Sequence, residues 1–138
     1  DPGNVGTVLR TLDAAGFDGC ILTPGCADPF GPKALRATMG SVFRVPLCFV
    51  PDAAEAARAL NARGYATLAA VLDGGDFYRR PPLPARLCVL IGNEGAGLTG
   101  QAQDACTHRF RLPMRGGAES LNAAVAAAVM MYDLINRA

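Results

Sequence analysis

The chain has 138 residues, a length that suits one domain built around one hydrophobic core. About half of the residues (51%) are hydrophobic and 18% are charged, which is the composition of a soluble globular protein. The 13 basic and 12 acidic residues give a formal net charge of +1, which excludes the strongly basic class of stand-alone nucleic-acid-binding domains.

Residue patterns exclude further classes of protein. No apolar run has the length and flanks of a membrane-spanning helix, and we recognise no signal peptide. The five cysteines are an odd number without a Cys-x-x-Cys pair, and three of them lie in apolar runs. We interpret these three, Cys20, Cys48 and Cys88, as small core residues in a reducing compartment. The single His108 has no companions at ligand spacing, so we expect no metal site.

Short helices and short apolar strands alternate in the first half of the chain. Asp1-Pro2-Gly3-Asn4 is a turn signature, and Asn4 can cap a helix whose apolar positions 5, 8, 9 and 12 have helical spacing. Gly16 ends this helix. The pattern then predicts a strand over 20–22, a loop over 26–32, a short helix over 33–38, a strand over 46–50, and a helix from the cap Asp52 through 63.

The second half continues this alternation. A buried strand over 66–72 leads into a loop over 73–86 that is rich in proline and arginine. The strongest strand signal, 87–91, ends at the turn Gly92-Asn93-Glu94-Gly95. A short helix over 98–105 and a last strand over 110–112 follow, before the long helix that ends the sequence.

That last helix, from 121 to 135, is apolar almost all round, and Ser120 sits where its N-cap belongs. A helix with one wet face would carry more polar residues. We therefore expect this helix to be buried on two sides, between a sheet and another body such as a second subunit. Asn122 is the polar exception in its first turn, and a buried amide needs hydrogen-bond partners.

The alternation of helices with continuous apolar strands predicts an α/β fold, with a mostly parallel sheet and helices on both faces. In such sheets ligands bind beyond the carboxyl ends of the strands, and three loops there stand out: 73–76, 92–97 and 113–120. The sequence opens at a turn with no strand before the first helix. Because an α/β unit usually begins with a strand, we expect the first strand to lie outside these residues.

Taken singly, the polar residues of these segments have ordinary structural interpretations. The glycine-rich turn 93–97 is also what a plain strand end looks like, and its glycine spacing is not a dinucleotide-binding fingerprint. Arg10 is compatible with a solvated helix arginine, and Glu94 with a loop carboxylate. Asn4 and Ser120 are both compatible with simple helix caps.

The combination is far more specific than any single motif. Asp1-Pro2-Gly3-Asn4-Val5-Gly6-Thr7 with Arg10, then Ile91-Gly92-Asn93-Glu94-Gly95, then Leu112-Pro113-Met114 with Glu119-Ser120-Leu121-Asn122 occur in this order with compatible spacing. They closely resemble the three motifs of the SpoU (TrmH) family, RNA 2′-O-ribose methyltransferases of the SPOUT superfamily. The resemblance covers essentially the whole sequence.

The resemblance implies a deep trefoil knot at the C-terminal end that holds S-adenosylmethionine. It implies catalytic roles for Arg10, Asn4, Glu94, Ser120 and Asn122. It also implies contacts with the methyl donor in the second and third motifs, from Gly92, Asn93, Gly95, Leu112, Met114, Ser120 and Leu121. We expect the donor to lie in a cleft made by loops 73–76, 92–97 and 112–122.

We interpret residues 1–138 as the catalytic domain of a cytoplasmic enzyme that methylates a ribose 2′-hydroxyl in rRNA or tRNA. Many family members carry a separate substrate-binding domain ahead of this one, and we expect it to be absent here. We also expect a homodimer formed through helices 4–15 and 121–135, with no membrane and no metal partner. The alternative function is a non-catalytic module that keeps the fold and binds RNA or a nucleotide.

Low net charge bears on how RNA would be held. A local arginine patch, a second subunit or a segment outside this sequence would supply much of the binding. Arg10 is expected to act through its fixed positive charge, which stabilises the forming alkoxide while a phosphate of the RNA is also engaged.

Overall fold

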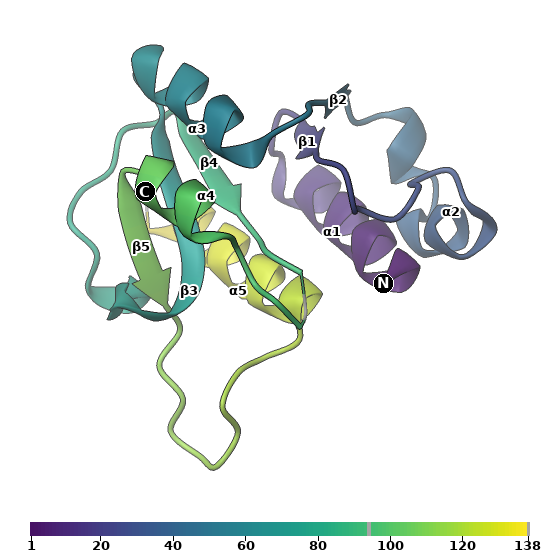
Figure 1. Ribbon diagram of the computed structural model, residues 1–138. Coiled ribbons are helices and arrows are strands. Elements are labelled where there is room, and N and C mark those ends of the chain that lie inside the picture. Colours follow the sequence, from purple (N-terminus) through teal and green to yellow (C-terminus); the bar gives the residue numbers. More distant parts are fainter. Residues whose placement is uncertain (94, 138) are drawn as a thin grey trace.

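The computed structural model describes residues 1–93 and 95–137, and helices alternate with strands through this part of the chain (Figure 1). The helices are α1 (Pro2–Ala15), α2 (Pro32–Thr38), α3 (Ala53–Ala62), α4 (Gly100–Ala105) and α5 (Ala123–Asn136). The strands are β1 (Cys20–Leu22), β2 (Leu47–Phe49), β3 (Ala66–Asp76), β4 (Leu87–Leu90) and β5 (His108–Arg111). Short 3-10 helices, η1 (Ser41–Phe43) and η2 (Phe77–Arg79), follow α2 and β3.

Every strand pairing among the described residues is parallel, which confirms the predicted strand direction. The strands form two groups rather than one sheet: β1 pairs with β2, and β3 lies between β4 and β5. Ala66 lies opposite Leu87, and Leu68 lies opposite His108. Because these strands are parallel, the carboxyl ends of β3, β4 and β5 meet at one edge of their sheet.

Helices cover both faces of the β4-β3-β5 sheet, as predicted for an α/β fold. Figure 1 shows α4 in front of this sheet and α5 behind it. Ala66, Thr67, Leu68 and Ala69 of β3 are all buried, which explains why this strand reads as a continuous apolar run rather than an alternating one. Within the described residues, no helix has the length and the unbroken apolar surface needed to cross a lipid bilayer.

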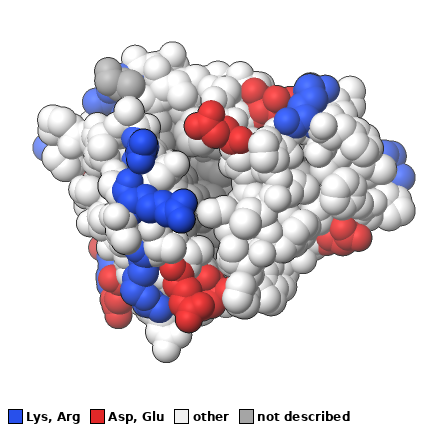
Figure 2. Space-filling model, turned by 90° about the horizontal axis from the view of Figure 1, so that it is seen from above, with Lys and Arg blue, Asp and Glu red and all other residues white. Residues whose placement is uncertain are grey.

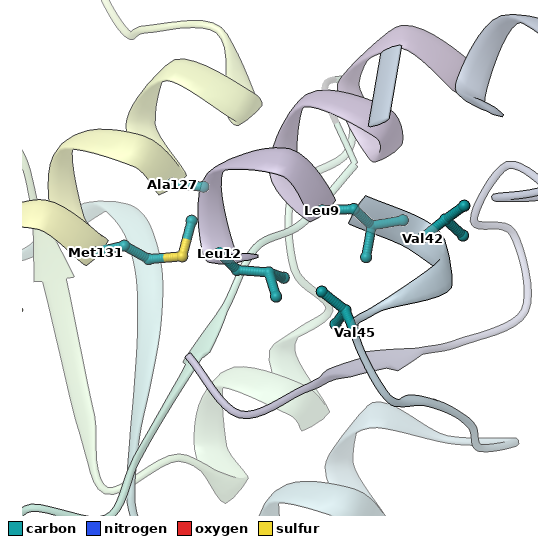
Figure 3. Packing of buried hydrophobic residues seen from close by; sticks show 6 residues of the cluster. All are labelled: Leu9, Leu12, Val42, Val45, Ala127 and Met131. Atoms are coloured by element: carbon teal, nitrogen blue, oxygen red, sulfur yellow. The ribbon is translucent and has the colours of Figure 1, made fainter. Parts of the chain in front are cut away.

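Helix α5 is buried on two sides, as its composition predicts. On the sheet side, Met130 and Leu134 join a cluster with Leu68, Phe77 and Phe110. On the other side, α5 meets α1 of the same chain (Figure 3), through a cluster made of Ala127, Met131, Leu9, Leu12, Val42 and Val45. The second body beside the helix is therefore α1, and burial of each of its leucines contributes about 1.5–3 kcal/mol.

A glycine sets the close packing of α1 against α2. A Cβ at Gly6 would lie 2.4 Å from the Cβ of Ala37 and 2.5 Å from the carbonyl oxygen of Ala34. Any larger residue at position 6 would push the two helices apart. At the start of these helices, the Lys33 ammonium lies 3.7 Å from the Asp1 carboxylate, so the N-terminal ends of α1 and α2 are neighbours.

Several predicted boundaries differ from the structure. Residues 73–76, predicted as a loop, are the end of β3, which continues past an irregular register between Ala70 and Gly75. A Cβ at Gly74 would lie 2.7 Å from the backbone of Arg109. Glycine at this position therefore lets β3 approach β5 closely and does not mark a turn. The last strand, predicted over 110–112, spans 108–111. The caps of α1 and α5 also differ and are described with the site.

One of the three cysteines predicted to be core residues is exposed. Cys48 lies on β2 of the two-stranded sheet, where both strands are edge strands, and the neighbouring Phe49 is 65% exposed. The prediction for Cys48 is therefore wrong, because an apolar run does not reveal which strand ends a sheet. Cys20 and Cys88 are half-buried, and burial raises the pKa of each thiol to about 11.

Candidate functional site

Two asparagines from opposite ends of the chain form the centre of the candidate site. The Asn122 side-chain amide donates to Oδ1 of Asn4 at 3.2 Å, although the two residues are 118 positions apart in the sequence. The Oδ1 of Asn122 also accepts from the backbone N–H groups of Ala124 (2.8 Å) and Val125 (3.2 Å), so it caps α5. The first and third predicted motifs therefore meet at the N-terminal ends of α1 and α5.

The predicted helix caps were wrong in both cases, and the difference matters for the site. Asp1, not Asn4, caps α1, by accepting from the backbone N–H of Gly3 at 2.7 Å. Asn122, not Ser120, caps α5. Because Asp1 caps the first helix, the amide of Asn4 is free to bond Asn122 instead. Asp1 is a contributing residue that sequence reasoning missed, although its residue type is a preferred cap.

One polar atom of this pair is left without a partner. The Nδ2 of Asn4 is buried and has no hydrogen-bond partner within residues 1–93 and 95–137. Leaving a buried donor unpaired costs about 1–3 kcal/mol, so native structures keep such atoms rarely. This donor is available to an acceptor at the site.

The turn after β4 is held in a tight reversal. Gly97 donates its backbone N–H to the carbonyl oxygen of Asn93 at 2.8 Å and has a positive φ of 68°. A Cβ at Gly92 would lie 2.3 Å from the backbone of Gly97 and Leu98, so only glycine fits there. Asn93 and Gly95 are exposed at the tip, and Glu94, a predicted catalytic residue, lies outside the described residues.

The turn comes close to the helices because Ile91, directly before it, packs against the cluster that contains Leu9 of α1 and Ala127 of α5. All three motif segments therefore lie in one region. We expected residues 73–76 to form one of the three loops around the methyl donor. In the structure these residues are part of β3 and do not form a loop. Ala69, in the middle of β3, lies opposite Leu90 at the end of β4, and β3 continues beyond it to Asp76, which lies opposite Arg111 of β5.

The connection from β5 to α5 carries the remaining predicted residues. Figure 1 shows it running out from β5 and returning to the start of α5 as a long excursion. Leu112 and Met114 are half-buried, and Leu112 packs against the cluster beneath α5. Ser120 and Leu121 are exposed, which leaves the Ser120 hydroxyl at the surface close to the Asn122 cap.

Arg10 is exposed on α1, two turns after the start of the helix. The carboxylate three positions ahead of it, Asp13, is already engaged by Arg44 (2.8 Å) and Ser41 (2.7 Å). The Ser41 hydroxyl, and after it the Arg44 guanidinium, hold the pKa of Asp13 below its usual value. Arg10 forms no ion pair with any carboxylate in the part of the chain that the structure describes, so its charge is available to a ligand.

Metal-binding side chains are not assembled here. Among the described residues, no three His, Cys, Asp or Glu side chains are close enough to hold one ion. His108 instead stacks on Phe110, with ring centres 5.5 Å apart, and lies 2.8 Å from the Thr107 hydroxyl. Figure 2 shows a face where basic and acidic side chains are mixed around a central hollow, and neither sign dominates it.

Comparisons with known proteins agree on one family. The model of the SpoU rRNA Methylase family matches residues 1–132. The chain is 39% identical over 136 residues to the 23S rRNA (guanosine(2553)-2′-O)-methyltransferase RlmP of Bacillus subtilis, a match that covers 97% of this chain and 54% of the relative. The chain therefore spans about half the length of the curated relatives it matches.

Two solved structures have the same fold as this chain. The SpoU methyltransferase AviRb of Streptomyces viridochromogenes, in complex with the cofactor AdoMet, matches with a TM-score of 0.89 and 34% identity. That match covers 99% of this chain and 54% of AviRb. An AdoMet-bound rRNA methyltransferase of Sinorhizobium meliloti matches with a TM-score of 0.90 and 38% identity, covering 99% of this chain and 52% of that protein.

Proposed function

The chain belongs to the SpoU rRNA methylase family, and from this membership we propose that it is the catalytic domain of a cytoplasmic RNA methyltransferase. The enzyme would transfer a methyl group from S-adenosylmethionine to a ribose 2′-hydroxyl of rRNA or tRNA. The observation that carries the proposal is the Asn4–Asn122 hydrogen bond, which joins the first and third motif segments in one site. The names of the relatives support the reaction and the class of substrate.

The residues expected to hold the methyl donor fit a ligand with several polar atoms. The turn at Gly92, Asn93 and Gly95, and the segment with Leu112, Met114, Ser120 and Leu121, present backbone groups outside regular pairing. The unpaired buried donor Nδ2 of Asn4 adds a place for an acceptor. When bound, S-adenosylmethionine supplies a methyl group activated by its sulfonium charge, which passes to the ribose oxygen as the carbon–sulfur bond breaks.

Arg10 is the residue we assign to the ribose hydroxyl. An alcohol is a weak nucleophile at neutral pH, and a nearby cation stabilises the alkoxide that forms. The guanidinium has several donors in a fixed plane, so Arg10 can bond the ribose oxygen and a neighbouring phosphate together. Asn4 and Asn122 hold the first and third motif segments together through their hydrogen bond. We assign Ser120 and Glu94 supporting roles in orienting the hydroxyl and its proton.

We infer that the active form is a homodimer that uses α1 and α5. Supporting this, α5 keeps an apolar stripe at the surface after packing against the sheet and α1. The stripe consists of four side chains that are 40–47% exposed: Val125, Tyr132 and Ile135 of α5, and Leu121 just before the helix. In the dimer, Arg10 of one protomer would serve the donor site of its partner.

The dimer is tested by size-exclusion chromatography with light scattering on the full-length protein. We expect two chains per particle at micromolar concentration for the wild type. Val125→Glu, which places a charge in the centre of the stripe, should give one chain per particle without loss of helical content. The control Glu55→Gln changes an exposed charge on α3 and should leave the dimer intact. A wild-type monomer would contradict the inference.

We also propose that the C-terminal segment forms the deep trefoil knot that the family resemblance implies. The long excursion between β5 and α5, and the packing of Ile91 against the cluster that holds Ala127, support this path of the chain. A crystal structure of the full-length protein would test it, because an unknotted trace through residues 87–136 would contradict the proposal.

The methyl-transfer function is tested with the full-length protein and labelled S-adenosylmethionine. RNA from cells that lack the protein should accept label on a ribose 2′-oxygen. The matched control is RNA from wild-type cells, which should accept little label because its site is already methylated. Calorimetry should show binding of the donor. Binding of RNA without donor binding or label transfer would instead establish the alternative, a non-catalytic RNA-binding module.

A further inference from the structure

A second hollow lies away from the asparagine pair, beyond the carboxyl ends of β1 and β2. It is a pocket of about 450 Å³. Residues of both strand ends and of the loop after β1 line it, including Leu22, Thr23, Pro24, Asp28, Phe49 and Val50. The sequence predicts only a loop at 26–32, although the rule that ligands bind beyond the strand ends applies to β1 as well.

The walls of this pocket are fixed by hydrogen bonds. Val50 donates its backbone N–H to the carbonyl oxygen of Leu22 at 2.9 Å, which joins the two strand ends. Two hydrogen bonds within the loop hold its shape. The Asp28 carboxylate accepts from the backbone N–H of Phe30 at 2.9 Å, and the backbone N–H of Cys26 donates to the Thr23 carbonyl at 3.2 Å. A ligand would therefore meet a formed pocket rather than an unordered loop.

The lining selects the chemistry of the occupant. Most of it is apolar, Asp28 is its one ionisable carboxylate, and no lysine or arginine lines it. A phosphate or a carboxylate would be repelled by Asp28 and would find no cation. Phe49 is 65% exposed and offers a free aromatic face, while the Thr23 hydroxyl and the Asp28 carboxylate offer polar contacts. These groups suit a flat, uncharged molecule with N–H donors at its edge.

The pocket is connected to the proposed reaction site through α2. Its loop leads directly into α2, and the first turns of α2 pack on the first turns of α1, which carry Asn4. The contact between Lys33 and Asp1 links the starts of the two helices. A nucleic-acid chain that reaches the Asn4 region can therefore continue past this pocket.

We propose that the pocket binds a nucleobase of the RNA substrate, stacked on Phe49 and held at its edge by Asp28 and Thr23. This inference rests on the proposed function, which supplies RNA as the substrate. Bases splayed out of single-stranded RNA are commonly recognised by aromatic stacking and by hydrogen bonds to their edges. Guanine fits best, because its adjacent ring and exocyclic N–H groups can both donate to one carboxylate.

The test measures binding of short RNA to the full-length protein by fluorescence anisotropy. The probes are labelled uridine hexanucleotides in which one central position is guanosine, adenosine, cytidine or uridine. We expect the guanosine probe to bind about 10-fold more tightly than the all-uridine probe. Phe49→Ala should weaken binding of the guanosine probe about 10-fold, the scale of losing one base–aromatic stack.

Two further variants separate the pocket from the general surface. Phe43→Ala is the matched control, because Phe43 is 75% exposed but does not line the pocket, and it should change binding less than about twofold. Asp28→Asn keeps an oxygen for the Phe30 N–H and should remove the preference for guanosine while leaving the all-uridine affinity nearly unchanged. Equal losses in Phe49→Ala and Phe43→Ala, or an unchanged preference in Asp28→Asn, would overturn the proposal.

Methyl transfer and donor binding are measured on the same protein preparations. If the wild type transfers methyl groups and Phe49→Ala binds every probe as the wild type does, the pocket proposal fails and the proposed function stands. If no preparation binds the donor or transfers a methyl group, the proposed function fails. In that case the base preference of the probes still decides whether the pocket binds a nucleobase.

Discussion

Two asparagine-centred clusters lie in different parts of this fold and differ in how completely they are hydrogen-bonded. Beneath α3, Asn61 donates to the Ala105 carbonyl (2.7 Å) and accepts from the buried Thr67 hydroxyl (2.7 Å). Thr67 is further tied to Thr107 through its hydroxyl and its backbone. At the other cluster, Asn4 accepts one bond from Asn122 and keeps a buried N–H group without a partner among the described residues.

The difference separates polar groups that are fully paired within the fold from a polar group that is available to a ligand. A buried network with all its members bonded adds rigidity, and losing one member leaves others unpaired. An incomplete network costs stability in the free protein and gains it back when an acceptor binds. A mutation in the first cluster should therefore mainly lower the stability of the fold, and a mutation in the second should mainly lower methyl transfer.

The largest expected effect concerns Arg10, the residue assigned to the ribose hydroxyl. Arg10→Ala should lower methyl transfer by about 100-fold or more, the scale of losing one transition-state donor. Arg10→Lys should restore little, because an ammonium lacks the planar fork. The thermal midpoint and the donor affinity should stay nearly unchanged, since the side chain is exposed. Turnover close to wild type in Arg10→Ala would remove this residue from the mechanism.

The next largest effect is expected for Gly92→Val, which should weaken binding of the methyl donor at the proposed site. A valine Cβ would meet the backbone of Gly97 and Leu98 at 2.3 Å, so the turn has to open. We expect donor affinity, measured by calorimetry, to fall at least about 10-fold, because the binding groups of the turn move by more than a hydrogen bond tolerates. The control Gly95→Ala, where a Cβ meets nothing within 4 Å, should bind the donor far better than Gly92→Val.

The smallest expected effect compares the two asparagines directly. Asn61→Ala should lower the free energy of unfolding by about 1–3 kcal/mol, because the Ala105 carbonyl and the Thr67 hydroxyl lose a buried partner. Asn4→Ala removes a donor that is already unpaired and an acceptor whose partner, Asn122, is exposed and can bond water instead. Its unfolding free energy should therefore change by less than about 1 kcal/mol while methyl transfer falls. Chemical denaturation measures both. Equal destabilisation by the two changes would erase the distinction between the clusters.

Much of the fold follows from local patterns, and the motif positions indicate which segments form the site. The alternation of apolar runs with capped helices predicts the parallel strands and helices on both faces, since both depend on short-range periodicity. The composition of residues 121–135 also predicts that α5 is buried on two sides. The side chains of Asn4 and Asn122 could be assigned to one site by resemblance alone, not by spacing.

What sequence reasoning missed depends on competition between similar residues and on contacts between distant segments. Ser120 and Asn122 are both good caps, and only the position where the helix begins chooses between them. Gly74 and Gly75 look like a turn, but the backbone of Arg109 on another strand makes them part of β3. Likewise, the pocket beside Phe49 forms only where the ends of β1 and β2 meet. Leu22 and Phe49 lie opposite each other there, although they are 27 positions apart in the sequence.

The bond between Asn4 and Asn122 also has a consequence for the order of events during folding. Its partners are separated by 118 positions, so closing this contact carries a large share of the loop-closure entropy of the chain. During synthesis Asn4 leaves the ribosome 118 residues ahead of Asn122. During synthesis α1, α2 and the strands can form while the site still lacks its second asparagine. The Asn4–Asn122 contact therefore forms only when α5 docks against α1.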